Sequence, residues 1–117
     1  MELRDIQNNV RDLCKKHNWE DTSLETRLRY LTGELLEVLD EVRTLVSSPE
    51  ESKELVKKRL GHEIFDVVWN LSELANRFGI DLDEAFKEKM LVNENRSFSD
   101  KPKSQRISFE ISSSNYL

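Results

Sequence analysis

The chain has 117 residues, of which 35% are charged and 8% aromatic, with only three glycines and two prolines. This length suits one domain, and the scarcity of turn-forming residues favours helices over strands. The net charge of −5 argues against nucleic acid as the main partner, and the single cysteine excludes an internal disulfide.

The first predicted helix covers residues 3–17, where Leu3, Ile6, Val10 and Leu13 recur at helical spacing. The polar segment 17–21 then interrupts the pattern. It contains Trp19, which is either a hydrophobic anchor for the first helix or a platform on which a nucleobase stacks. The sequence leaves both roles open.

The second predicted helix begins near Thr22, whose spacing to Glu25 fits a capping box, and ends near Val46. Its apolar face follows an unbroken heptad pattern: Leu24, Leu28, Leu31, Leu35, Val38, Val42 and Leu45. After it, Ser48 suits the cap and Pro49 the first position of a third helix.

The third predicted helix ends near Phe78, with Gly79 as its terminator, and Gly61 offers a place for a bend. Its apolar face carries Leu60, Ile64, Val67, Leu71, Leu74 and Phe78. Asp81 then caps a fourth helix that extends to about Arg96. We expect the second and third helices to bury their apolar faces against each other in an all-α four-helix bundle formed by residues 1–98.

Residues 99–117 differ in composition, because serine and other polar residues dominate and Pro102 blocks a helix. They are predicted to form a non-helical C-terminal tail. No apolar run approaches the roughly 18 residues that a membrane-spanning helix needs, and the N-terminal residues have no signal-peptide core. We therefore expect a cytoplasmic protein that binds neither membrane nor nucleic acid.

Two pairs of acidic residues carry the functional signal. Glu34 and Glu37 lie one turn apart on the second helix, and Glu63 and Asp66 lie one turn apart on the third. Each pair borders an apolar stripe, and each is followed by a third polar residue, Glu41 and Asn70, on the same flank. If the helices pack antiparallel, four carboxylates meet, and their repulsion favours a site that collects a cation. The alternative is a solvated acidic face.

The type of cation follows from the ligands. The chain has two histidines, and neither forms the E-x-x-H motif on which di-iron bundles depend. Carboxylates alone suit hard cations, so we predict Mg²⁺, with Mn²⁺ as an alternative.

E-x-x-E followed after 25 residues by E-x-x-D, together with the downstream G-I-D-L turn, resembles the MazG-like all-α nucleoside triphosphate pyrophosphatases. The resemblance covers about residues 15–98. It implies that Glu34, Glu37, Glu63 and Asp66 bind Mg²⁺, with Glu34 or Glu37 also activating the attacking water. The resemblance also implies that Lys89, Asn93 and Arg96, which share one helix face, contact the substrate. Trp19 and Asn70 are two further candidates for substrate binding.

The predicted function is therefore Mg²⁺-dependent hydrolysis of a (deoxy)nucleoside triphosphate to a monophosphate and pyrophosphate, in nucleotide-pool housekeeping. Two alternatives stay open: a non-catalytic helical scaffold or regulatory protein, and a hydrolase of a related phosphoribosyl or nucleotide substrate. Phe65, Val68 and Trp69 form a second apolar face on the third helix. Since one chain cannot cover both faces, we expect a homo-oligomer, either a dimer or a tetramer.

Overall fold

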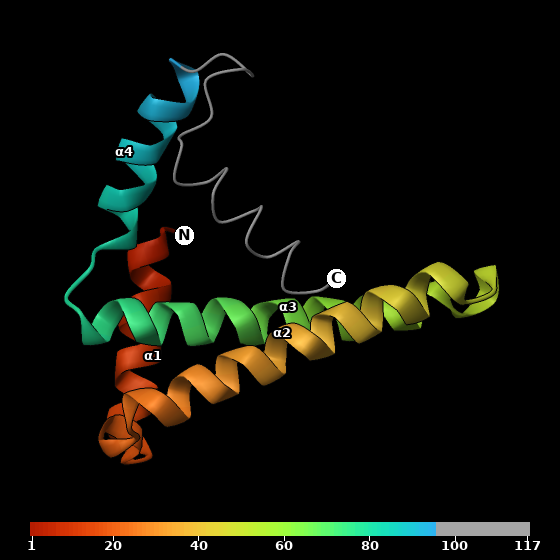
Figure 1. The fold of residues 1–117 in the computed structure, drawn as a ribbon, viewed down its shortest axis with the longest axis horizontal. Helices are drawn as coiled ribbons and strands as arrows, with labels where there is room; N and C mark the ends of the chain where they lie inside the picture. The colour runs from red at the N-terminus through yellow and green to blue at the C-terminus, as the bar shows by residue number, and fades with distance from the viewer. Residues whose placement is uncertain (96–117) are drawn as a thin grey trace, which may run out of the picture. The chain divides into compact units, whose positions relative to one another are not determined.

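The structure is a computed structural model that describes residues 1–95. The elements are α1 (Leu3–Lys16), the 3-10 helix η1 (Trp19–Asp21), α2 (Leu24–Ser47), α3 (Glu50–Arg77) and α4 (Leu82–Glu94). The prediction of an all-α fold with four helices is confirmed over residues 1–95, among which there is no strand (Figure 1). The packing of all four helices into one bundle stays a prediction. The predicted tail at 99–117 lies outside the described residues, as does Arg96.

The chain divides into two units, Met1–Asp83 and Glu84–Leu117. The first unit holds α1, η1, α2, α3 and the start of α4. In it, α2 and α3 form a long antiparallel hairpin, and α1 crosses the C-terminal half of α3 (Figure 1). Within residues 1–95, no helix is both long and apolar enough to span a membrane.

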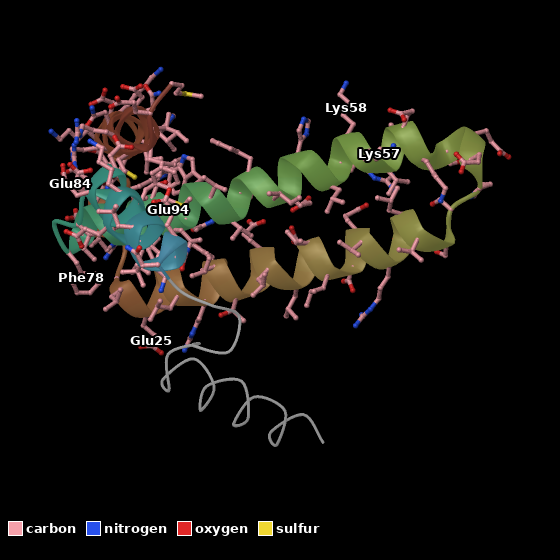
Figure 2. The ribbon with its side chains drawn as sticks, turned by 90° about the horizontal axis from the view of Figure 1, so that it is seen from above. Glu25, Lys57, Lys58, Phe78, Glu84 and Glu94 are labelled. Carbon is pink, nitrogen blue, oxygen red and sulfur yellow. The ribbon has the colours of Figure 1, made fainter. Side chains whose placement is uncertain are left out.

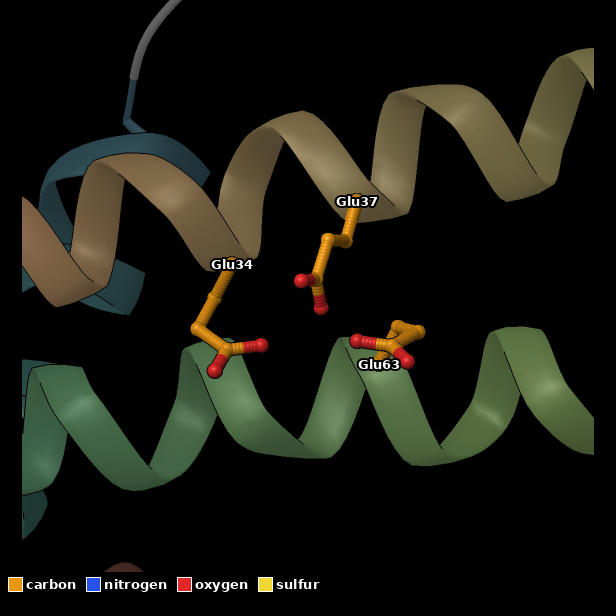
Figure 3. A group of neighbouring side chains, drawn as sticks. All are labelled: Glu34, Glu37 and Glu63. Atoms are coloured by element: carbon orange, nitrogen blue, oxygen red, sulfur yellow. The ribbon is translucent and has the colours of Figure 1, made fainter.

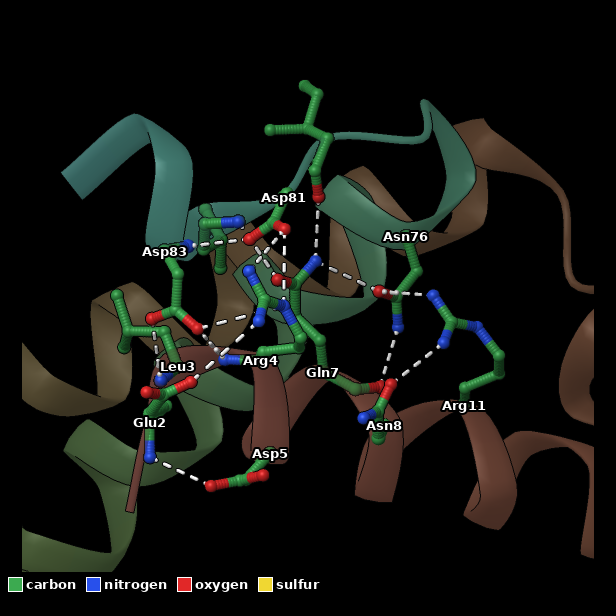
Figure 4. Close-up of polar contacts among 12 residues, drawn as sticks. Glu2, Leu3, Arg4, Asp5, Gln7, Asn8, Arg11, Asn76, Asp81 and Asp83 are labelled. Carbon is green, nitrogen blue, oxygen red and sulfur yellow. Dashed lines mark hydrogen bonds and ion pairs between the residues drawn. The ribbon is translucent and has the colours of Figure 1, made fainter. Parts of the chain in front are cut away.

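Polar contacts hold α1 against the turn that follows α3 (Figure 4). The backbone N–H groups of Leu3 and Arg4 each donate to the Asp83 carboxylate at 3.1 Å. The Gln7 side-chain amide donates to the Ile80 carbonyl at 2.7 Å and to Asn76 Oδ1 at 3.0 Å. Because each contact joins residues distant in the sequence, α1 has a fixed position on α3.

The end of α3 confirms the role predicted for Gly79. Its φ of 65° is left-handed, which glycine adopts without steric cost. The Gly79 N–H donates to the Asn76 carbonyl at 3.2 Å, and the Ile80 N–H donates to the Ala75 carbonyl at 2.9 Å. This pair of hydrogen bonds is a Schellman motif, which satisfies carbonyls at the helix end. Next, the Asp81 carboxylate accepts the Asp83 N–H at 2.9 Å, as expected of a cap for α4.

Two predicted caps are wrong by one residue. Ser23, not Thr22, caps α2, since its hydroxyl accepts the Thr26 N–H at 3.1 Å. The Thr22 N–H is already used in closing η1, which moves the cap one position on. Likewise Pro49 occupies the cap of α3 instead of its first position. Ser48 ends α2 in an extended conformation, as expected for a residue before proline.

The prediction that α2 and α3 bury their apolar faces against each other is wrong for half of each stripe. Every second member stays on an open side of the hairpin, 41–49% exposed: Leu28, Leu35, Val42, Ile64 and Leu71. Leu24 and Phe78, from the ends of the two stripes, are also exposed. We call the five central residues the open stripe. Two helices in contact cover only those parts of their apolar faces that adjoin each other. Leu31 and Val67 are therefore partly buried, whereas Leu35 and Leu71 remain exposed to solvent.

The apolar core of the first unit is consequently small. Among residues 1–95, the buried apolar side chains are Val10, Cys14, Val56 and Ala75. Polar side chains instead lie where α2 and α3 face each other, from Arg27 and Glu73 to Glu41 and Arg59. We call this line of facing residues the groove, and it forms the candidate site.

Candidate metal and nucleotide site

Three of the four predicted acids come together in the groove between α2 and α3. Glu34 and Glu37 extend from α2 and Glu63 from α3, and the three side chains point toward one another (Figure 3). One carboxylate oxygen from each lies within 4.8 Å of the others. The spacing of three residues places Glu34 and Glu37 on one side of α2, and the antiparallel hairpin brings Glu63 opposite them.

The proximity of these carboxylates changes their acidity. The pKa of Glu63 is raised to about 7, first because its protonated form can donate a hydrogen bond to Glu37. Burial and the charges of Glu37, Asp66 and Glu34 add to this shift. The pKa of Glu34 is also raised, mainly by burial and then by the charge of Asp66. Without a cation, the cluster therefore disfavours full ionisation.

The same cluster fits a divalent cation. The Oε2 atoms of Glu34 and Glu63 are both buried, and neither has a hydrogen-bond partner in the described part of the chain. Such orphaned acceptors are costly unless a ligand or water satisfies them. A donor set made of carboxylates alone suits Mg²⁺ or Mn²⁺. Asp66 is more exposed and lies outside the group of three, yet its charge raises the pKa of both Glu34 and Glu63.

Beside the acids lies a cavity of about 520 Å³ with aromatic walls. Trp19 and Trp69 meet edge to face in it, with ring centroids 6.2 Å apart, and His17 stacks on Trp19 at 4.6 Å. Tyr30 lines the cavity as well, and Glu34 and Asp66 border it. The cavity thus places flat apolar surfaces next to a carboxylate cluster. Trp69, which the sequence assigned to a subunit interface, contacts Trp19 within the chain.

Asn70 provides a polar group in this cavity. It is 91% buried, and its side-chain N–H donates to the Asp66 carbonyl at 2.8 Å. Because only the amide nitrogen can donate to a carbonyl, this bond fixes which atom is Oδ1. That oxygen is buried and has no hydrogen-bond partner within residues 1–95. It is available to accept a hydrogen bond from a ligand in the cavity.

Arg27, which was not predicted from the sequence, also lines the cavity. Its guanidinium carbon lies 5.2 Å from the Trp69 ring centroid and 5.8 Å from that of Tyr30. The buried Glu73 carboxylate is 3.7 Å from its Nε. The signal was the spacing, since Arg27 is seven residues before Glu34 and therefore lies on the same line along α2.

A second arginine fixes the loop that carries Trp19. Arg77, near the end of α3, forms an ion pair with Glu73 and donates a hydrogen bond to the Thr22 carbonyl. Thr22 closes η1, so this contact ties the loop between α1 and α2 to α3. The Trp19 wall is therefore held by a buried polar network.

The predicted phosphate ligands belong to the other unit. Lys89 and Asn93 are exposed residues of α4, four positions apart and so on one helix face. Arg96 lies beyond the described residues. The roles of these three residues remain predictions.

Comparisons with known proteins do not identify a family. No protein-family model matches the sequence, and neither the curated proteins nor the solved structures contain a match to it.

Proposed function

We propose that this protein is a Mg²⁺-dependent nucleoside triphosphate pyrophosphohydrolase of the MazG-like type. The observation that supports it best is the carboxylate cluster of Glu34, Glu37 and Glu63 beside an aromatic cavity. Two buried oxygens of this cluster have no hydrogen-bond partner among the described residues. A cation site next to flat apolar walls suits a ligand that combines phosphates with a planar ring.

In this proposal the cavity takes the nucleobase. The rings of Trp19 and Tyr30 offer stacking surfaces, worth about 1–3 kcal/mol per base in other base-stacking sites. Asn70 Oδ1 accepts a hydrogen bond from an N–H group on the edge of the base, which removes the cost of a buried acceptor without a partner. The sugar and α-phosphate then lie toward Glu34 and Asp66, which border the cavity.

Glu34, Glu37 and Glu63, with Asp66, would hold Mg²⁺ at the phosphates. When bound, the cation neutralises phosphate oxygens, polarises phosphorus and acidifies a nearby water. One carboxylate must accept the proton of the attacking water, and we assign this role to Glu34 or Glu37. Lys89 and Arg96 would stabilise the charge on the departing pyrophosphate.

The decisive experiment is a panel of canonical and modified nucleoside triphosphates incubated with Mg²⁺, with monophosphate and pyrophosphate quantified. We expect stoichiometric release of both products, and loss of both in Glu34→Gln and Asp66→Asn variants that keep wild-type helicity. Absence of turnover across the panel, or near-full activity in either variant, would contradict the proposal. A non-catalytic scaffold predicts neither pyrophosphate release nor stabilisation by Mg²⁺.

We also propose that the protein is a homo-oligomer in which a second copy packs on the open stripe. The five residues of this stripe leave exposed apolar side chains on both helices of a hairpin whose own core is small. A second identical face, related by a two-fold axis, would give four packed helices. Because the stripe and the acids lie on different sides of the α2–α3 contact, assembly would leave the groove open.

Sedimentation equilibrium of the wild type and of Leu35→Glu tests the assembly. The charge placed in the stripe should yield monomers, since an unpaired charge in an interface is strongly destabilising. The matched control is Leu36→Glu, because Leu36 is also exposed but is not part of the open stripe. A wild-type monomer that is active would show that the stripe is not an interface.

A further inference from the structure

Arg59 is a basic residue at the edge of the acid cluster. It lies on α3 one turn before Glu63, and its Nε is 3.6 Å from Glu41 Oε2. Glu41 lies on α2 one turn after Glu37. Arg59 and Glu63 are four residues apart, about 40° on the helix wheel, so Arg59 projects from the acid-bearing side of α3.

The groove between α2 and α3 has a linear order. The aromatic cavity lies at one end, beside Asn70 and Asp66; the three glutamates follow; and the Arg59–Glu41 pair comes next toward the tip of the hairpin. From Asp66 to Arg59 the axis of α3 rises about 10 Å, at 1.5 Å per residue. A nucleoside triphosphate with its base in the cavity and its α-phosphate at the acids can reach Arg59 with its last two phosphates if the chain continues along the groove.

Other basic side chains in this part of α3 are engaged elsewhere or point away. Lys57 pairs with Glu54 at 3.3 Å, and Lys53 donates to the Leu45 carbonyl at 3.0 Å. Lys58 extends away from α2 (Figure 2). Of the four basic residues within 53–59, Arg59 is therefore the one that faces the groove.

The Arg59–Glu41 contact is easily exchanged. The Arg59 side chain is half exposed, so its guanidinium is open to solvent and can be reached by a ligand. Glu41 Oε2 is buried and has no hydrogen-bond partner among the described residues, so the contact is not a well-formed hydrogen bond. A phosphate group offers an arginine two parallel hydrogen bonds, which are stronger.

We propose that Arg59 binds the β- and γ-phosphates of the substrate and leaves Glu41 to do so. This role of Arg59 rests on the proposed function. It adds a phosphate-binding residue of the first unit to Lys89, Asn93 and Arg96, the phosphate contacts proposed above. It would also explain a preference for binding triphosphates over monophosphates, because only the longer phosphate chain reaches Arg59.

Binding of non-hydrolysable ligands tests this without turnover. Isothermal titration calorimetry in Mg²⁺ would compare the α,β-methylene analogues of the four deoxynucleoside triphosphates with the corresponding monophosphates. Arg59→Ala should weaken triphosphate-analogue binding about 10- to 100-fold, the loss of a charge-assisted contact, with monophosphate binding unchanged. Arg59→Lys should retain part of the affinity. Glu41→Gln should tighten triphosphate binding, because it removes the competing carboxylate.

Arg43→Ala is the matched control. Arg43 forms a similar ion pair, 3.5 Å from Asp40, but it lies about 180° from Glu34 around α2 and should have no effect. Equal triphosphate affinity in the wild type and Arg59→Ala would overturn the role of Arg59 while leaving the proposed function intact. Failure of the wild type to bind any analogue or hydrolyse any triphosphate would overturn both. An equal loss of monophosphate binding would show that Arg59 only supports the structure.

Discussion

Neutralising Glu63 should stabilise the protein in the absence of metal. Glu63→Gln keeps the shape of the side chain but removes one of three carboxylates whose oxygens lie within 4.8 Å of one another. At that distance a pair of like charges costs about 1 kcal/mol in water and about 3.5 kcal/mol at an effective dielectric constant of 20. Since the cluster is partly exposed, we take the lower figure for each of the two pairs.

The pH decides when this gain is visible. The pKa of Glu63 in the folded protein is raised to about 7, so between the ordinary glutamate value and about 7 the folded state holds a proton that the unfolded state releases. This contribution to wild-type stability is present at low pH and is lost as the pH rises through about 7. The variant should therefore match the wild type near pH 5 and exceed it near pH 8.5.

Thermal unfolding followed by circular dichroism, with a chelator present, measures the difference. A gain of about 1–2 kcal/mol near pH 8.5 raises the melting temperature by about 4–8 °C per kcal/mol for a domain of this size. Adding Mg²⁺ should reverse the order, because a cation that binds only the folded wild type stabilises it. Glu54→Gln, an exposed acid of α3 outside the cluster, is the control. If Glu63→Gln is no more stable than the wild type near pH 8.5, or if Mg²⁺ shifts both equally, the cluster is not a cation site.

Three further predictions concern other parts of the chain. Trp19→Ala should weaken binding of nucleoside triphosphates about 10-fold but leave inorganic triphosphate unaffected, as measured by calorimetry; equal losses for both would exclude base stacking. Lys89→Ala and Arg96→Ala should each weaken triphosphate binding by about 1–3 kcal/mol without changing helicity, and wild-type affinity in both would leave them as solvated charges. Burial raises the pKa of the Cys14 thiol, so a thiol reagent should modify it only as fast as the protein unfolds; rapid modification under native conditions would show an open α1–α3 contact.

Local sequence patterns predicted the helices and the acid cluster well. The helix boundaries follow from apolar periodicity and from Gly79, which depend on neighbouring residues alone. Glu34, Glu37 and Glu63 could be placed on facing sides because spacing fixes direction around a helix. The cap at Ser23 could not be predicted, since it depends on η1 using the Thr22 N–H first.

Properties that depend on long-range packing were harder to predict. A heptad stripe indicates which face is apolar, but not how much of it a single partner helix covers, so the exposure of Leu35 and Leu71 was missed. Arg27 reads as an ordinary surface arginine until Glu73 and Trp69 are brought to it from α3. In the same way, the sequence could not show that Asn70 Oδ1 has no partner within residues 1–95, because this depends on the bond from the Asn70 amide to the Asp66 carbonyl.

Each side of the α2–α3 hairpin carries a feature that does not stabilise the isolated chain, and the two features differ in kind. On one side, Glu34 and Glu63 place in the groove buried oxygens that have no hydrogen-bond partner within residues 1–95, which destabilises the folded chain unless a cation binds. On the other, the open stripe exposes apolar area that contributes nothing to stability until it is covered. The small apolar core of residues 1–95, in which Val10 and Val56 are buried, cannot easily offset both. Covering the stripe with a second copy would supply burial on the side away from the acids and so hold α2 and α3 at the separation at which their carboxylates can share one cation.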